Sequence, residues 1–471
     1  MSRKYIINTL LSGIILLSGF TSCGVYKTPD VDTQNMFRGE ENPTDTTTIA
    51  DIPWREYFTD PALQALIDEG LTNNYDMQIA YTHIQQAEAG LIIAKSAYFP
   101  TIALAGQVTQ TVISEGKNGE KKVLGYNGGT SYGLGIAVSW EADLWGKMNR
   151  RSKAQYANLL GTQAYRNLVQ TSLISNIATT YYTLLALDEQ LKITKETVDL
   201  LKESTATMSS MMQAGLLNRA GVKQSEALLY GTQVSIPSIE IQIRQLENTL
   251  SMLVGSKPGP IDRTAIRNQS VPSRLAFGVP AQMLAKRPDV FQAEMGFRYA
   301  FEMKNAAQRS LYPSLTIGSS TSPSTVGFFS NTLSQFFNPG NIIASIMGGL
   351  VQPLFAGNQL KGQYKIATAQ QEEALLTFKK TVLNASQEVS NILYTYETSL
   401  QKNENRSKQV ESLLTAVNDT KKLLTAGEAN YTEVLNAEQN LLQAQLGQVN
   451  DKLEQLQATV NLYRALGGGV K

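Results

Sequence analysis

The stretch "KSAYFPTIALAG" (95–106) reads as the last turn of an amphipathic helix, a proline, and then small and apolar residues that alternate with period two. A similar junction, "QRSLYPSLTIGS" (308–319), recurs later in the chain, with Tyr312-Pro313 in the place of Phe99-Pro100. Recurrence of such a junction indicates an internal duplication. We therefore expect two similar halves, each with its own helix-to-strand crossing.

Two uninterrupted helical runs follow these junctions, Lys147 to Gln213 and Gln359 to Thr425, each without proline and with a single glycine. At 1.5 Å per residue, each predicts a helix roughly 100 Å long. Each run is followed by an Ala-Gly pair, Ala214-Gly215 and Ala426-Gly427, which predicts a helix cap and a chain reversal. The return segments carry apolar residues at the three-four spacing of helices packed along their length: Ile236, Ile239, Ile243, Leu246, Leu250 and Leu253, then Leu446, Val449, Leu453, Leu456, Val460 and Tyr463.

Before each long run lies a pair of strand-like segments, clearest at "SYGLGIAVSW" (131–140), where large apolar residues alternate with small ones from Tyr132 to Trp140. About 10 residues with an aromatic at each end suit a lipid-facing strand of an outer-membrane barrel, although a half-buried soluble sheet alternates in the same way. The polar, glycine-rich stretch 115–129 is predicted as a loop, and 324–341 is predicted as the matching loop of the second half. Four strands per chain cannot close a barrel, so closure would need further copies.

The N-terminus has the pattern of a secretory signal: Arg3 and Lys4, an apolar run, and then "FTSC". Cys23, the single cysteine, stands where a bacterial lipoprotein signal is cut and lipidated; ordinary cleavage beside an unmodified cysteine is the alternative. The predicted organisation is a signal peptide (1–22), a lipid-anchored linker (23–60), a first half (61–280; strand pair about 100–141, helical hairpin about 147–254) and a second half (281–471; strand pair about 313–353, helical hairpin about 359–466).

Composition argues against several classes of function. The 41 Lys and Arg balance 40 Asp and Glu, which gives no reason to expect nucleic acid as a partner. The single histidine, His83, lacks the partners that a zinc site or histidine-based catalysis needs, and no glycine-rich phosphate loop is present. Met208, Met211 and Met212 suit helix packing better than soft-metal binding. We expect no enzyme, no metal and no cofactor other than a lipid on Cys23.

Four motifs resemble the TolC-type outer membrane factors, and most closely the lipoprotein branch that serves RND efflux pumps. They occur in the family's order and are "WREYFTDPALQALIDEGLTNNYDMQIA" (54–80), "SWEADLWGKMNRRSKA" (139–154), "LAKRPDVFQAE" (284–294) and "LYRALGGG" (462–469). The resemblance implies a mixed α and β membrane protein: a homotrimer whose twelve-stranded β-barrel, four strands per chain, continues as a periplasmic α-helical barrel. It also implies an outer-membrane location with a lipid anchor and with helices that extend into the periplasm.

The resemblance further implies roles for individual residues. The pairs Ala214-Gly215 and Ala426-Gly427 would lie at periplasmic tips that dock an adaptor protein, with plain capping as the alternative. Glu433 and Asn436 match the family's channel-gate positions, with Asn436 where aspartate is usual, and a solvated helix face is the alternative for Glu433. Gly221 stands where an acidic residue is common, so we assign no gate to the first tip. Tyr132 and Trp140 are expected at the membrane interfaces, in contact with outer-membrane lipid.

The function expected from these features is a passive exit duct for small molecules in a tripartite efflux system. Its partners would be a periplasmic adaptor and an inner-membrane RND transporter, which would supply the driving force. A duct for type I protein secretion is the alternative within the same architecture. A periplasmic adaptor or a structural coiled-coil lipoprotein is the alternative from another class, but an adaptor would show one hairpin and a coiled-coil lipoprotein has no use for the alternating strands.

Overall fold

The computed structural model describes residues 25–30, 49–111, 129–270, 286–318, 324–355 and 357–470. The chain divides into two units, Met1–Asp32 and Thr33–Lys471, and every element below belongs to the second. The predicted signal peptide and Cys23 lie outside the described residues. Among the described helices, none is long and apolar enough to span a membrane.

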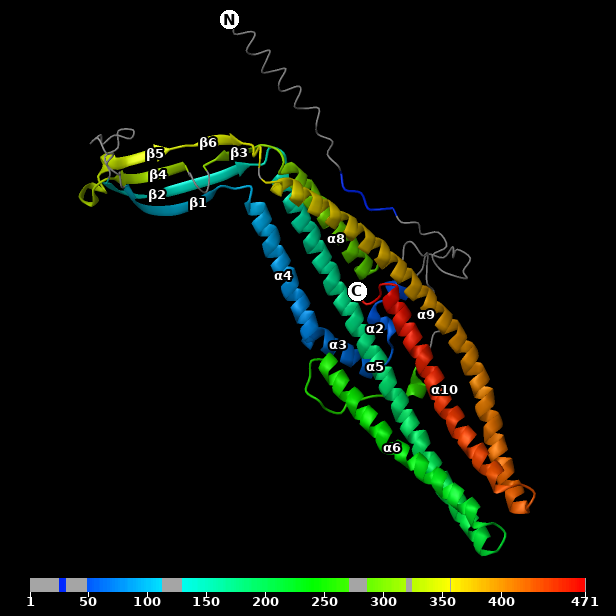
Figure 1. Ribbon diagram of the computed structural model, residues 1–471. Coiled ribbons are helices and arrows are strands. Elements are labelled where there is room, and N and C mark those ends of the chain that lie inside the picture. The colour runs from blue at the N-terminus through cyan, green and yellow to red at the C-terminus, as the bar shows by residue number, and fades with distance from the viewer. Residues whose placement is uncertain are drawn as a thin grey trace. The chain divides into compact units, whose positions relative to one another are not determined.

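The helices divide between the two halves of the chain (Figure 1). The first half contributes α2 (Trp54–Tyr57), α3 (Pro61–Asn73), α4 (Tyr75–Ser96), α5 (Lys147–Gln213) and α6 (Arg219–Leu253). The second half contributes α8 (Pro288–Arg309), α9 (Gln359–Ala426) and α10 (Tyr431–Ala465), and short 3-10 turns are η2 (Ile49–Asp51), η3 (Ile266–Asn268), η4 (Leu333–Gln335) and η5 (Pro339–Asn341). The two long runs in the sequence are thus the helices α5 and α9.

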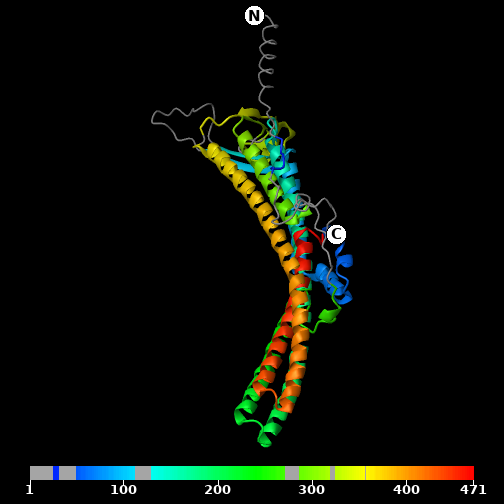
Figure 2. The ribbon, with the colours of Figure 1, turned by 90° about the vertical axis from the view of Figure 1, so that its right-hand side faces the viewer.

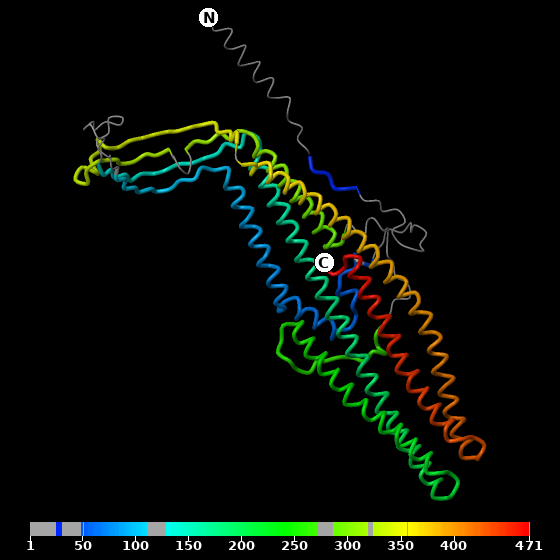
Figure 3. The backbone as a smooth tube through the Cα atoms, viewed as in Figure 1, coloured from blue at the N-terminus to red at the C-terminus, as the bar shows by residue number. Residues whose placement is uncertain are grey.

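The helices of both halves form one layer. Next to the strands, α4, α5, α8 and α9 lie side by side in that order, as their contacts show. Farther from the strands, α6 occupies the position in the layer that α4 has near the strands. In the same way, α10 follows α8, as Figure 3 shows. Helix α10 packs against both α9 and α5, so the two hairpins α5–α6 and α9–α10 are neighbours.

The predicted three-four seams are confirmed as packing surfaces. In α6, Leu250 is fully buried and Ile243 nearly so, and in α10 the same holds for Leu456 and Val460. All four belong to the central core, which also buries the aromatic residues near α2 and the C-terminal end of α10. This core lies midway along α5. Burial of its large apolar side chains stabilises the contact between the two halves of the chain.

The strands form one antiparallel sheet, made of β1 (Thr101–Thr111), β2 (Gly129–Ala142), β3 (Ser314–Ile317), β4 (Ser324–Ser330), β5 (Ile342–Ser345) and β6 (Gly348–Val351). Strand β2 pairs with β1 on one side, and with β3 and β4 in succession on the other. Strands β6 and β5 continue the sheet beyond β3 and β4. The sheet is therefore four strands wide, with the third and fourth positions each shared by two short strands.

The prediction that 324–341 is a loop is wrong for its first part, because Ser324–Ser330 is strand β4. Gly327 of this strand lies opposite Gly135 of β2, and a Cβ on Gly327 would come within 2.3 Å of the Gly135 Cα. Glycine here permits a close approach of two strands. Of the other predicted loop, 115–129, only Gly129 lies within the described residues, and it begins β2.

The strand register separates two faces of the sheet, because directly paired residues project to the same side. One face gathers large apolar side chains: Ile102, Leu104, Val108, Tyr132, Leu134, Ile136, Val138, Trp140, Leu315, Ile317, Val326, Phe328, Ile342 and Leu350. We call it the apolar face. The opposite face of β1 and β2 carries small and polar residues such as Ala103, Gln107 and Ser131.

Candidate functional site: the hairpin tips and the helix-to-strand junctions

The first tip joins α5 to α6 through "AGLLN" (214–218). Ala214 closes α5, and Gly215 has a φ of 75°, a left-handed conformation that glycine adopts without steric cost. The Gly215 N–H donates to the Met212 carbonyl at 3.0 Å. The Asn218 side chain accepts a hydrogen bond from the Gly221 N–H at 3.0 Å and so caps α6.

The second tip, "AGEAN" (426–430), repeats this construction. Helix α9 ends at Ala426, Gly427 has a φ of 78°, and its N–H donates to the Leu424 carbonyl at 3.1 Å. The Asn430 side chain accepts from the Thr432 N–H and caps α10. The sequence predicted both Ala-Gly reversals, but the two asparagine caps were not identified from it, although asparagine before a helical run is a known start signal.

The two tips pack against each other, as Figure 2 shows at the end farthest from the strands. Met208 and Val222 from the first hairpin share an apolar cluster with Leu424 and Val434 from the second. Met208 is completely buried there. The methionines near the first tip therefore act in packing, as predicted.

Gly221 lies at a close contact between the two tips. A Cβ at Gly221 would lie 3.1 Å from ring atoms of Tyr431, the first residue of α10. A larger side chain would push that ring away, which gives a physical reason for glycine where acidic residues are common. This contact joins residues far apart in the chain, so the sequence held no signal for it.

Glu433 and Asn436 lie one turn apart in the first turns of α10, and both side chains are exposed on the same face of the helix. The Glu433 N–H donates to the Asn430 carbonyl at 3.0 Å. Within the described ranges the structure gives the Glu433 carboxylate no ion-pair partner. The Glu433 carboxylate can therefore interact with solvent or with another molecule on this face of α10.

A buried carboxylate one turn farther along α10 was missed by sequence reasoning. The side chain of Glu438 is only 6% exposed, and the Lys421 ammonium of α9 lies 2.8 Å from one of its oxygens. The contact is an ion pair by distance rather than a well-directed hydrogen bond, since neither carboxylate oxygen has a hydrogen-bond donor among the described residues. Removal of the lysine would leave a buried charge without compensation.

Two tryptophan side chains form hydrogen bonds to the backbone at the helix-to-strand junctions. The indole N–H of Trp140, on β2, donates to the Tyr98 carbonyl at 2.9 Å, directly before the first crossing. The indole N–H of Trp145 donates to the Pro313 carbonyl at 2.7 Å, at the second crossing. Tyr132 lies near the other end of β2, paired with Val108 and with β4. Trp140 was predicted as an interface aromatic, whereas the role of Trp145 was not foreseen.

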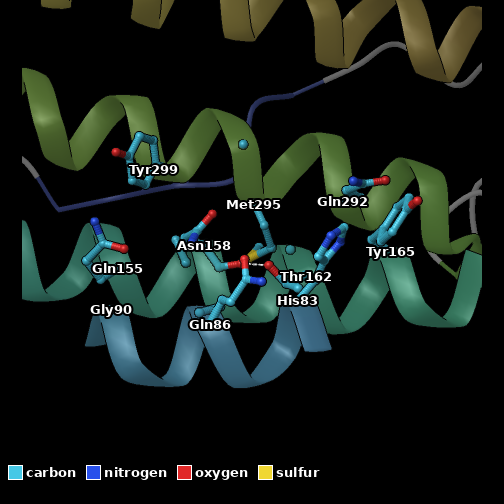
Figure 4. A pocket seen from close by; sticks show the side chains of 14 residues that line it. His83, Gln86, Gly90, Gln155, Asn158, Thr162, Tyr165, Gln292, Met295 and Tyr299 are labelled. Carbon is cyan, nitrogen blue, oxygen red and sulfur yellow. Dashed lines mark hydrogen bonds between the residues drawn. The ribbon is translucent and has the colours of Figure 1, made fainter. Parts of the chain in front are cut away.

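A groove of about 660 Å³ runs between α4, α5 and α8. Its lining is polar but uncharged, with amide side chains from all three helices, and Figure 4 shows them around the groove. His83 of α4 lines it, and its ring stacks on Tyr165 of α5 with 6.0 Å between ring centroids. Neither a carboxylate nor a thiol is among the residues that line this groove.

The model of the family described as outer membrane efflux protein matches residues 66–256 and 279–468, that is, both halves. The chain belongs to this family. Among its curated relatives, the probable outer membrane lipoprotein SilC of Salmonella typhimurium is 26% identical over 463 residues and covers 98% of each chain. The solvent efflux pump outer membrane protein SrpC of Pseudomonas putida is 28% identical, covering 88% of this chain and 87% of its own.

Solved structures agree on the fold. The outer-membrane channel OprN superposes with a TM-score of 0.85 at 22% identity, covering 95% of this chain and 98% of its own. The two hairpins and the four-strand-wide sheet are therefore the fold of an outer-membrane channel. As an outer membrane efflux protein, the chain works in the outer membrane in the export of molecules from the cell.

Proposed function

We propose that three copies of this outer membrane efflux protein close a twelve-stranded barrel, and that their helices form a tunnel beneath it. The observation that carries the proposal is the sheet, which has one apolar face and two free edges. Within the described residues, the outer edges of β1 and of β5 and β6 pair with no other strand. Backbone groups at such edges are costly in lipid, and pairing with further copies satisfies them.

The assembly would act as a passive duct, as expected of a protein in the outer membrane efflux family. Substrates enter from the periplasm or from an inner-membrane RND transporter, which supplies the energy. The two tips at Ala214-Gly215 and Ala426-Gly427 are the proposed docking points for the periplasmic adaptor. Their exposed glycines support this, because a Cβ at Gly215 or Gly427 would meet nothing within 4 Å. The lipid on Cys23 is the proposed anchor.

Glu433 is the proposed gate residue. Three copies related by symmetry would bring three exposed carboxylates together near the tips, where they repel one another and attract cations. Asn436, one turn on, adds a polar ring without charge. Replacement of Glu433 by glutamine is expected to lower cation preference in planar-bilayer recordings, while Glu411→Gln on α9 serves as a matched loss of an exposed carboxylate. Unchanged selectivity in both variants would remove Glu433 from the gate.

Two competing functions predict different behaviour. A duct for protein secretion would use the same tube, so only the transported molecule distinguishes it from an efflux duct. Cells that lack a secretion duct would lose a secreted protein and keep their resistance to small molecules. An adaptor would contain one hairpin, and this chain has two. The test is to delete the protein and to measure sensitivity to solvents, drugs, bile salts and metal ions. Increased sensitivity to at least one class supports efflux; unaltered sensitivity with a lost secreted protein contradicts it.

A further inference from the structure

The turn between β4 and β5, residues 331–341, is unlike the corresponding stretch of the first strand pair. From Ser324 to Phe355 the sequence contains no aspartate, glutamate, lysine or arginine. By contrast, "EGKNGEKK" (115–122) between β1 and β2 is strongly charged. In Figure 1 the β4–β5 turn is at the end of the sheet farthest from the helices. The two turns therefore differ in charge, although residues 331–341 include uncharged polar side chains such as Asn331 and Gln335.

Three phenylalanines form a cluster in this turn. Phe336 and Phe337 contact each other with 5.0 Å between ring centroids, and both reach Phe328 of β4, at 6.3 and 5.8 Å. Phe336 is buried by the cluster, whereas Phe337 is 72% exposed and Leu333 is 69% exposed. The turn thus presents large apolar side chains outward over a packed aromatic base.

The cluster continues the apolar face of the sheet. Phe328 pairs directly with Leu134 on one side and with Ile342 on the other, and both residues belong to that face. The next residue, Phe329, points to the opposite face, where its ring lies over Gly133. Because Phe336 and Phe337 contact the ring of Phe328, the turn folds toward the apolar side of the sheet.

Several polar groups of the turn bond to one another, although the side chains of Asn331, Ser334 and Gln335 are exposed. Ser330 Oγ donates to the Thr332 carbonyl at 2.9 Å, and the Asn338 side chain accepts from the Gly340 N–H at 3.0 Å. The Asn341 amide donates to the Gln335 carbonyl at 2.7 Å. Backbone groups satisfied inside the turn lower the cost of placing it against hydrocarbon.

We propose that the β4–β5 turn is a wedge inserted among the acyl chains of the outer leaflet, with Leu333 and Phe337 in contact with lipid. Continuity with the apolar face identifies the occupant, because the same hydrocarbon that covers Leu134 and Ile342 extends to Phe328 and its cluster. The absence of charge over 324–355 fits hydrocarbon and leaves no ionic group to select a protein partner. The inference rests on the proposed membrane placement of the sheet.

The test uses the full-length protein reconstituted in phosphatidylcholine vesicles, with and without bromine on the acyl chains. Phe337→Trp adds a fluorophore at a highly exposed site, so the packing beneath it is kept. Its added emission, obtained by subtracting the parent protein, is expected to be lost in brominated vesicles. Leu216→Trp at the first tip is the matched control, since Leu216 is 73% exposed, and its emission should survive bromine and fall with aqueous iodide.

Other results overturn the inference. If iodide and not bromine quenches the Phe337→Trp emission, the turn is in water. If neither quenches it, another protein surface covers the turn. The emission of Trp140, isolated by comparison with Trp140→Phe, reports on the sheet. If bromine quenches the Trp140 emission but not the Phe337→Trp emission, the sheet lies in lipid and only the wedge is rejected. If bromine quenches neither emission, the proposed barrel is rejected as well.

Discussion

The two helical hairpins share their turns but differ in what holds their helices together. In α5–α6, Val198 and Leu201 pack on Leu229, and the hydroxyls of Thr205 and Ser225 lie 2.6 Å apart. The cross-hairpin ion pair there, Lys195 with Glu240, has both side chains half exposed. Such a pair contributes little to stability, so this part of the hairpin is held mainly by apolar packing. Nearer its base, Arg263 bridges Asp188 of α5 and Glu247 of α6.

In α9–α10, three cations of α9 face three carboxylates of α10. The pairs are Lys402 with Glu454, Arg406 with Asp451 and Lys421 with Glu438. The exposure of the carboxylates falls toward the tip, from Glu454 through Asp451 to Glu438, which is almost completely buried. The second hairpin therefore adds a row of ion pairs to its apolar contacts, in which Val410 and Val417 of α9 pack with Leu441 and Ala444 of α10.

The largest effect is expected from Lys421→Ala, which leaves the Glu438 carboxylate buried and unpaired. Because Lys421 is about a third exposed, we expect a cost of about 2 kcal/mol, below that of a fully buried pair. Amides of α10 beside the tip should then exchange with deuterium roughly 30-fold faster, since 1.4 kcal/mol corresponds to a factor of ten.

The control is Lys195→Ala in the first hairpin, which breaks an exposed pair and should change exchange in α6 by less than about fivefold. The double variant Lys421→Ala with Glu438→Gln should recover part of the loss, because a neutral amide costs less to bury than a charge. Equal effects of Lys421→Ala and Lys195→Ala would show that the two hairpins are held in the same way.

The next effect concerns the contact between the hairpins. Gly221→Leu forces a side chain against the Tyr431 ring and should destabilise the joined tips by about 1 kcal/mol, the low end of overpacking costs, because the half-buried ring can move aside. Gly231→Ala on the same helix meets nothing within 4 Å and should stabilise α6 by up to about 1 kcal/mol through helix propensity. Deuterium exchange of both tips measures the two variants. If Gly221→Leu protects the tips as Gly231→Ala does, the Gly221–Tyr431 contact is not a constraint.

The smallest effect is expected at the base of the first hairpin. Burial alone would raise the pKa of the Asp60 carboxyl, but hydrogen bonds from Thr264, Tyr181, Gln269 and the Ala62 N–H outweigh it, so the pKa is lowered. A lowered pKa means that the stabilisation is complete above the unfolded value near 3.9 and is lost as pH falls through the folded value. Thermal unfolding between pH 5 and 3 should show this loss.

Asp60→Asn should remove that part of the acid sensitivity. The base of the second hairpin provides the contrast: the Arg287 guanidinium donates to Glu388 at 2.8 Å and to the Ala465 carbonyl at 2.7 Å. An acid profile of Asp60→Asn that matches the parent would show that this carboxyl does not link pH to stability.

The long helices, the reversals and the alternating strand were predictable because each depends on residues close in the sequence. Strand β4 was missed because Gly327 looks the same in a loop and in a close strand contact, and only its partner Gly135 separates the two. Two further contacts join different helices. The ion pair of Lys421 with Glu438 connects α9 to α10, and Gly221 of α6 contacts Tyr431 of α10. The spacing of residues along the sequence does not predict such contacts, because they depend on how the helices pack in space.

The central claim is that free edges of the sheet close on neighbouring copies, and disulfide trapping between those edges tests it most directly. Ala105→Cys on β1 is combined in turn with cysteine at each residue of β5, and outer membranes are oxidised, boiled in detergent and separated without reductant. The account predicts that at least one pair gives a covalent trimer that reductant converts to monomer. Only monomers from every pair, or an open ladder without a discrete trimer, would contradict it.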